Sequence, residues 1–224
     1  MFVAASHYIT DKKLGRFVVS IFALSLIHKS ALILLPLYFL LYKDFYLKYR
    51  TVNILVLIVC TVIGTYASFS EAMLSTSNIF SLLGYDAYAE NMDMVLEDTR
   101  TMTWGPVRII LYLKDILIIW CYPYVYNYFN KDRWINMVFN MFLLGTCLYN
   151  LLVLNGIMFT RPLMYLRIFG LIMAGLTLYV LFKRKMTMKF SILMFSVISY
   201  IYISHFKLYA AGVLDSPILY KFCF

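Results

Sequence analysis

Long apolar runs, separated by short charged breaks, constrain this chain more than any other feature of its sequence. The run from Trp134 to Leu154, for example, contains no charged residue. A helix needs about 20 mainly apolar residues to cross the hydrocarbon core of a bilayer. Only 14% of all residues are charged and 63% are apolar, so the chain could not cover a water-facing surface. The sequence excludes a soluble globule and predicts an all-α, polytopic integral membrane helix bundle, a single transmembrane domain over 1–224.

The apolar runs predict about five full spans. They cover Val52–Phe69, Ile109–Phe129, Trp134–Leu154, Arg167–Phe182 and Phe190–Leu208. The apolar run before Asp11 is shorter, since nine helical residues cover only about 14 Å of a core roughly 30 Å thick. It predicts a partial N-terminal helix, which is either an interfacial stub or the continuation of a longer chain. The tyrosine-rich segment 121–129 is typical of an aromatic belt at the membrane surface.

Charged residues predict the direction of these spans. Twelve of the 20 Lys and Arg residues lie in four clusters, at 11–16, 43–50, 130–133 and 183–189. Basic residues collect in cytoplasmic loops, so all four clusters are predicted to be cytoplasmic. Six of the 11 acids fall in 70–107, which is predicted to be an extracytoplasmic loop. The net charge of +9 is therefore read as a signal of orientation and of contact with membrane lipids, not of nucleic-acid binding.

The segment 17–42 is apolar apart from three serines and the neighbouring His28 and Lys29 near its middle. A single helix here would place the basic clusters before and after it on opposite sides of the membrane. Two short helices that form a hairpin, or a re-entrant pair, keep both clusters on the cytoplasmic side. Ser30 could cap the second helix. His28 could carry a proton or contact a phosphate, or it could simply occupy a turn beside a snorkelling Lys29.

Two arginines contradict the orientation rule. The predicted topology places Arg161 in an external loop and Arg167 at the same outer edge, with no acid between them. Pro162 suits the first turn of a helix, which would leave Arg161 at the helix N-terminus, where an anion is favoured. Tyr165 lies four residues after Arg161 and would share its face. These residues predict a site for a diphosphate, or else arginines that snorkel to lipid phosphates.

Carboxylates offer further candidates for chemistry. Asp86 and Glu97 belong to the acidic, aromatic outer segment, where an acid could act as general base for a sugar hydroxyl or could only be solvated. Lys114 and Asp115 interrupt a span; as neighbours they point about 100° apart and should not form an ideal pair. They could line a polar cavity or lie nearer the outer interface. The four cysteines are far apart, and nothing in the sequence requires a metal or another cofactor.

Two segments resemble the EpsG family of bacterial multi-span proteins. FVVSIFALSLIHKSALILLPLYFLL is similar to the surroundings of that family's H-x-S motif, here His28 and Ser30. FTRPLMYLRIF is similar to its R-x-x-x-Y segment, here Arg161 and Tyr165. Proteins of the family are longer, with further spans before this part, so the chain resembles their C-terminal portion.

The resemblance implies a polysaccharide polymerase of the bacterial inner membrane, in exopolysaccharide, capsule or O-antigen assembly. Such a glycosyltransferase joins polyprenyl-diphosphate-linked oligosaccharide units at the outer leaflet, and other polysaccharide-assembly proteins are its expected partners. On this hypothesis Arg161, Arg167 and Tyr165 bind the diphosphate, while His28, Asp86 or Glu97 accepts a proton. The alternatives are a transporter or flippase for a lipid-linked saccharide and a non-catalytic subunit of an assembly complex.

Overall fold

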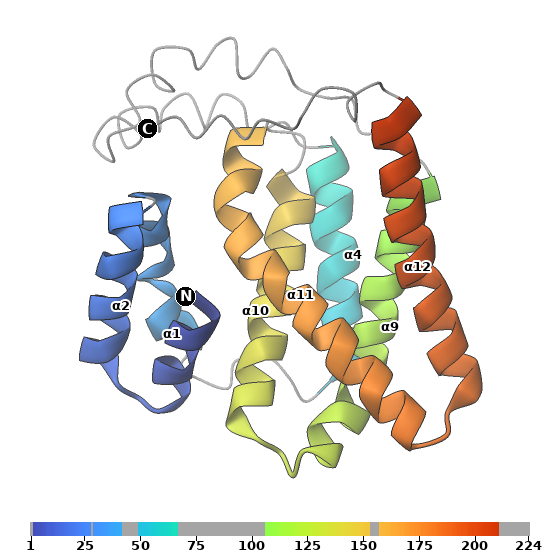
Figure 1. Cartoon of the computed structure of the whole chain (residues 1–224), viewed down its shortest axis with the longest axis horizontal. Helices are drawn as coiled ribbons and strands as arrows, with labels where there is room; N and C mark the ends of the chain where they lie inside the picture. Colours follow the sequence, from blue (N-terminus) through green and yellow to red (C-terminus); the bar gives the residue numbers. More distant parts are fainter. Residues whose placement is uncertain (1, 28, 42–48, 67–105, 153–156, 211–224) are drawn as a thin grey trace.

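The computed structural model describes residues 2–27, 29–41, 49–66, 106–152 and 157–210. Within these ranges the chain forms helices and no strand, which confirms the all-α prediction (Figure 1). The elements are α1 (Phe2–Thr10), α2 (Leu14–Ile27), a 3₁₀ helix η1 (Lys29–Leu34), α3 (Leu37–Leu41), α4 (Arg50–Tyr66), α9 (Pro106–Tyr128), α10 (Arg133–Leu152), α11 (Ile157–Lys183) and α12 (Thr187–Ala210).

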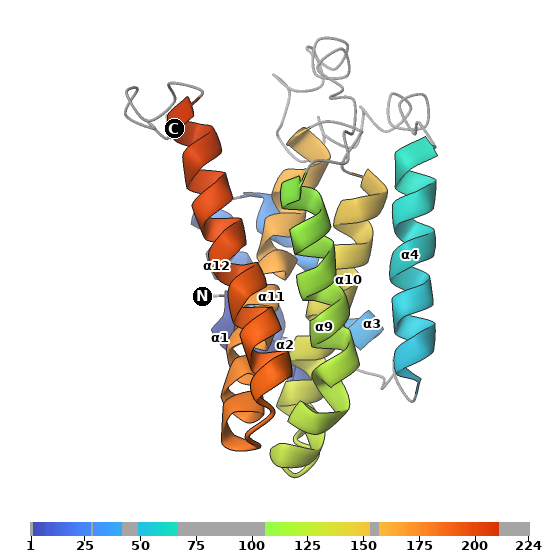
Figure 2. The same ribbon diagram turned by 90° about the vertical axis from the view of Figure 1, so that its right-hand side faces the viewer.

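Five long helices form an antiparallel bundle around α10 (Figures 1 and 2). Helices α4, α10 and α12 run in one direction, and α9 and α11 run in the other. Helix α10 packs against α4, α9 and α11, and twelve of its residues are buried. In contrast, α4 presents exposed apolar side chains such as Leu55 and Val62 on its outer face. Such a face is suited to lipid, because lipid tails are as apolar as the side chains themselves.

Three helical segments in the described ranges are long and apolar enough to cross a membrane: Ile109–Tyr128, Arg133–Leu152 and Tyr165–Lys183. Leu14–Ile27, Arg50–Tyr66 and Thr187–Ser199 are shorter apolar helical segments. The integral-membrane class of the prediction is thus supported, while a count of five full spans stays a prediction. Helix α4 illustrates the difference, because its 17 residues extend only about 25 Å.

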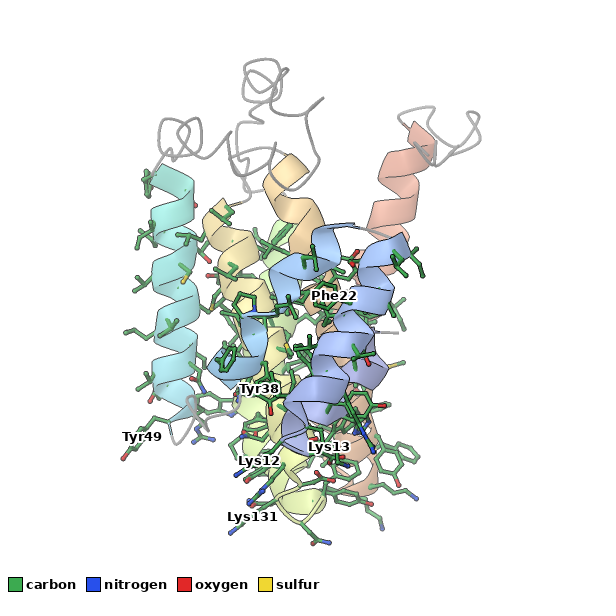
Figure 3. All side chains as sticks on the ribbon, turned by 90° about the vertical axis from the view of Figure 1, so that its left-hand side faces the viewer. Lys12, Lys13, Phe22, Tyr38, Tyr49 and Lys131 are labelled. Carbon is green, nitrogen blue, oxygen red and sulfur yellow. The ribbon has the colours of Figure 1, made fainter. Side chains whose placement is uncertain are left out.

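The chain reverses direction within the predicted hairpin. Helix α2 ends at Ile27, η1 packs back against α2, and the ring of Tyr38 lies 5.4 Å from that of Phe17 near the start of α2 (Figure 3). The second arm, however, is not the single short helix that was expected. It is a 3₁₀ helix followed by the five-residue α3, and Pro36 lies between them.

Proline explains the break in this arm. Pro36 has no N–H to donate, and its ring disfavours helical geometry at the residue before it. Hydrogen bonds from the N–H of Leu35 to the carbonyl of Leu32, and from Tyr38 to Leu35, are of the tighter three-residue type. Ser30 lies inside η1 instead of preceding a helix, so its predicted capping position is wrong.

Basic residues from all four clusters meet at one end of the bundle. Lys12, Lys13, Lys131 and Tyr49 all lie at this end in Figure 3, and the turn between α11 and α12 lies there in Figure 1. We call it the basic end. Here Lys13 donates a hydrogen bond to Asp11, and this bond together with the lysine charge lowers the pKa of the Asp11 carboxyl. The predicted topology requires the four basic clusters to lie on one side of the membrane, and their location at one end of the bundle agrees with this requirement.

Cysteine labelling tests this topology directly. Lys131→Cys and Lys185→Cys, each in a chain whose native cysteines are replaced by alanine, should both resist a membrane-impermeant maleimide in intact cells. Both should react after the cells are opened. Tyr66→Cys is the matched control at the opposite end, where Tyr66 is 85% exposed, and it should react in intact cells. If only one of the two cysteines, at position 131 or at position 185, were labelled from outside, the two turns would not lie on the same side of the membrane.

Two glycines allow close contacts between helices. At Gly64 on α4, an added Cβ would lie 2.7 Å from the Cα of Leu151 and nearer still to the carbonyl oxygen of Asn150. At Gly145 on α10, it would lie 2.6 Å from the Cβ of Leu166 on α11. Small residues at such crossings let backbones approach and gain packing energy inside a bilayer. These two contacts hold α4 and α11 against the central helix.

Candidate functional site

Charged side chains lie inside the bundle, in the half away from the basic end. Lys114 and Asp115 lie on α9, about 12 Å below its start, and Arg167 lies on α11, about 15 Å below its start. A charge at such a depth costs several kcal/mol unless it faces a cavity, a partner or a ligand. These residues, together with Tyr149 on α10, form what we call the inner polar cluster.

Lys114 and Asp115 form an ion pair, with 2.9 Å between the lysine Nζ and the Asp115 Oδ1. Only 15% of the lysine side chain and 12% of the aspartate side chain are exposed. These neighbours do form an ion pair, because the long lysine side chain bridges the angle between them, but the pair lacks the ideal geometry, as expected. The same Oδ1 has no partner in hydrogen-bond geometry, so its contact with Lys114 is mainly electrostatic.

Arg167 packs on an aromatic ring. Its guanidinium carbon lies 4.0 Å from the ring centroid of Tyr149, within the range of a cation–π interaction. The side chain is half-buried, and in the described part of the chain no carboxylate forms an ion pair with it. No Asp or Glu occurs in 133–214, so α10, α11 and α12 offer Arg167 no carboxylate, and Asp115 on α9 is already paired with Lys114. The ring of Tyr149 covers one face of the Arg167 guanidinium. The N–H donors lie in the plane of the guanidinium, so the ring does not cover them.

The cluster therefore has an excess positive charge. Asp115 is balanced by Lys114, and its carboxylate is also within the electrostatic reach of Arg167. Two cations and one anion leave a net charge of one, inside a region where charges are weakly screened. An incoming anion would be bound by the guanidinium through charge-assisted hydrogen bonds.

Helix α9 is held in place beside the cluster by a tyrosine. The hydroxyl of Tyr112 donates to the Leu57 carbonyl at 3.0 Å and also contacts the Thr61 hydroxyl, both on α4. Tyr112 and Asp115 are three residues apart and share one face of α9. The bonds to α4 therefore restrict the rotation of the helix segment that carries the buried carboxylate.

Helix α11 carries the three residues that were predicted to bind a diphosphate. It begins at Ile157, so Arg161 is its fifth residue and Pro162 lies in the second turn. The prediction that Pro162 occupies the first turn and Arg161 the N-terminal end is wrong. The free N–H groups of this helix belong to its first four residues, 157–160, so its dipole is strongest there. Arg161 and Arg167 are nevertheless on one continuous helix.

The other predicted site residues have different outcomes. Tyr165 is half-buried on α11, two residues before Arg167, so the two side chains leave the helix on opposite sides. His28, Asp86 and Glu97 lie outside the described residues, as does nearly all of the predicted loop 70–107. Tyr149 was not a candidate in the sequence, because a single tyrosine in an apolar run carries no sign of the arginine that packs on it.

No group of three His, Cys, Asp or Glu side chains that could hold a metal ion occurs among the described residues. Cys121 and Cys147 are buried and Cys60 is half-buried; all three are free thiols. Within the inner polar cluster, Arg167 and Lys114 can stabilise negative charge, and Tyr149 and Asp115 can form hydrogen bonds.

Comparison with known families gives one match. The model of the EpsG family matches residues 1–222, which is essentially the whole chain. That family suggests a polysaccharide polymerase-like membrane protein, in agreement with the apolar helices described above. No curated protein and no solved structure matches the chain.

Proposed function

Because this chain belongs to the EpsG family, we propose that it takes part in polymerising a bacterial surface polysaccharide at the outer leaflet of the inner membrane. The substrates are oligosaccharide repeat units linked to a polyprenyl diphosphate. The reaction is a glycosyl transfer from one lipid-linked unit to a hydroxyl of another. The sugar–diphosphate donor is already activated, so no nucleotide sugar is needed.

The half-buried Arg167 carries this proposal. It has an aromatic partner and no ion-pair partner in the described part of the chain, and it lies in the half of the bundle opposite the basic end. A positive charge kept at this depth is costly unless a partner or a ligand compensates it, and the one nearby carboxylate, Asp115, is already paired with Lys114. A diphosphate suits the requirement, because a planar guanidinium can bind two phosphate oxygens at once. Arg161, on the same helix and nearer its start, supplies the second positive charge in this proposal.

The transfer step needs few groups from the protein. The bond between the anomeric carbon and the diphosphate oxygen breaks, and a bond from the acceptor hydroxyl oxygen to that carbon forms. The diphosphate leaves with the bonding electrons, and Arg161 and Arg167 stabilise its negative charge. The acceptor proton passes to a base, for which His28, Asp86 and Glu97 are the candidates. Tyr165 leaves α11 on the side opposite Arg167, so it is not assigned to the phosphate that Arg167 binds.

A lipid-linked saccharide flippase is the second candidate function. The observation in its favour is the broken arm of η1 and α3, since discontinuous helices line the binding sites of many transporters. The two functions differ in where the lipid-linked unit accumulates when the protein is impaired. Loss of a polymerase leaves single units exposed on the outer leaflet, whereas loss of a flippase leaves them on the inner leaflet.

Substitution of Arg167 tests the proposal. In cells that make the native polysaccharide, Arg167→Ala should reduce high-molecular-weight polymer at least tenfold, because one lost charge-assisted contact to the leaving group costs about 1.5–3 kcal/mol. Arg167→Lys should restore part of the polymer, since lysine keeps the charge but not the two-pronged geometry. Polymer is measured by gel separation of surface polysaccharide, with single lipid-linked units labelled from outside.

Arg133→Ala is the matched control. Arg133 is an exposed arginine at the basic end, far from the first half of α11, which carries Arg167. It should leave polymer length unchanged. Immunoblots of membranes must show equal amounts of all variants. Normal polymer from Arg167→Ala at equal abundance would exclude the assigned role, and accumulation of single units on the inner leaflet would favour the flippase.

A further inference from the structure

A second group of cations lies at the basic end, on the opposite half of the bundle from Arg167. The guanidinium carbon of Arg184 lies 5.8 Å from the ring centroid of Tyr124, and the Nζ of Lys189 lies 5.0 Å from the same centroid. Tyr124 belongs to the last two turns of α9, whereas the cations come from the end of α11 and the start of α12. Three elements thus place two positive charges around one half-buried ring.

Among the described residues, neither cation forms an ion pair with a carboxylate. No acidic residue occurs between 133 and 214, so α11, α12 and their connecting turn contain none. The nearest acid at the end of α9 is Asp132, which accepts a 2.7 Å hydrogen bond from the Trp134 N–H at the start of α10. The other described acid at this end, Asp11, pairs with Lys13. Two like charges that converge without a carboxylate repel each other unless an anion lies between them.

The cations are held by an ordered turn. The Lys185 N–H donates to the Phe182 carbonyl at 3.0 Å, and the Met186 N–H donates to the Leu181 carbonyl at 3.0 Å. Lys185 itself has a φ of 53°, the left-handed geometry that reverses the chain between α11 and α12. Beside the turn, Lys183 lies 5.8 Å from the ring of Tyr179. Backbone hydrogen bonds therefore set the positions from which Arg184 and Lys189 reach Tyr124.

Apolar side chains continue from this site along the outside of the bundle. Met188, Ile192 and Phe195 on α12 are 77%, 44% and 71% exposed. Their spacing of four and three residues places them on one face of the helix, in a stripe that begins beside Lys189. A phosphate bound at Tyr124 would lie at the end of the apolar segment Ile109–Tyr128, at headgroup depth. Acyl chains attached to that phosphate could lie along the stripe.

We propose that Tyr124, Arg184 and Lys189 form a binding site for the phosphate group of an anionic phospholipid. The two cations neutralise the phosphate, the tyrosine ring limits their movement, and the α12 stripe accepts the acyl chains. Inorganic phosphate has the same headgroup chemistry but gains nothing from the stripe. The site is separate from the inner polar cluster, so it does not depend on the proposed polymerase reaction.

Lipid binding to the purified full-length chain in detergent tests the proposal. Dioleoylphosphatidylglycerol should raise the apparent Tm and should be retained in native mass spectra, whereas dioleoylphosphatidylcholine should do so much less. Arg184→Gln/Lys189→Gln should weaken phosphatidylglycerol binding by roughly 25–30-fold, given about a fivefold loss for each removed surface charge. Tyr124→Leu, which keeps both charges, should also weaken it. The Tm without lipid shows whether each variant is folded.

The control is Lys131→Gln/Arg133→Gln, which removes two charges from the neighbouring turn at the same end. It should keep most of the phosphatidylglycerol effect. Equal loss of binding in both double variants would overturn the proposal, since it would mean only a diffuse attraction to the basic end. An equal Tm increase with inorganic phosphate at the same concentration would overturn the assignment to a lipid.

Discussion

Gly64→Ala is expected to separate α4 from α10 and to destabilise the bundle. The added methyl carbon would lie 2.7 Å from the Leu151 Cα, well inside the roughly 3.5 Å at which carbon atoms make ordinary contact, and nearer still to the Asn150 carbonyl. Both atoms belong to the backbone, so no side-chain rotation relieves the overlap. Overpacking of this kind costs about 1–3 kcal/mol.

The separation of α4 should also weaken other contacts. Thr61 and Leu57, which bond to Tyr112 on α9, lie on the same face of α4 as Gly64. We expect a fall of several degrees in the apparent Tm of the purified chain in detergent, followed by fluorescence-detected size exclusion after heating. Gly145→Ala should act similarly, because its methyl would meet the Leu166 Cβ at 2.6 Å.

Gly175→Ala is the matched control. Gly175 lies on α11, in a helical segment like the other two, but a methyl there meets nothing within 4 Å. Alanine has the higher helix propensity by about 1 kcal/mol, so this variant should be neutral or slightly more stable. A stability of Gly64→Ala equal to that of Gly175→Ala would show that α4 does not pack on α10 as described.

Asp115→Ala is expected to have the second large effect, because it leaves Lys114 buried without its counter-charge. Breaking a buried ion pair by removing one partner costs about 3–5 kcal/mol. Arg167 is also within electrostatic reach of this carboxylate, so a second cation would lose part of its compensation. Unfolding in mixed micelles with increasing dodecyl sulfate, followed by far-UV circular dichroism, measures the loss.

The paired variant Lys114→Met/Asp115→Leu distinguishes the effect of an uncompensated charge from the effect of a lost side chain. Removing both charges leaves no buried ion, and such replacements are often neutral. The paired variant should therefore recover most of the stability lost in Asp115→Ala. If both variants are equally unstable, the ion pair is not the source of the effect, and side-chain packing at this position of α9 is.

Several elements were predictable because their causes are local. The segments 109–129 and 134–154 were expected as spans, and α9 and α10 match them within a few residues. Apolar length and flanking charges are properties of a single segment, and the bilayer acts on each segment separately. The chain reversal in 17–42 followed from the charges on either side of it.

The errors concern features that depend on neighbours. The span predicted at Arg167–Phe182 agrees with the apolar segment Tyr165–Lys183, but the helix that contains it begins earlier, at Ile157, and Pro162 lies in its second turn. Pro36 was present in the hairpin sequence, yet the form of the break, a 3₁₀ helix packed against α2, required the partner helix. The ion pair of Lys114 and Asp115 depended on a side-chain conformation that helix spacing does not specify.

The sequence by itself determined that this chain forms membrane-spanning helices, that the basic clusters share one end, and that unneutralised arginines occur on the later helices. These properties follow from the residue types in each segment and from the order of the charged clusters along the chain. The tertiary structure decided which residues meet: Arg167 with Tyr149, Arg184 and Lys189 with Tyr124, and Gly64 with the α10 backbone. The reason is that any apolar helix face is equally compatible with lipid or with another helix, so only packing selects its neighbour.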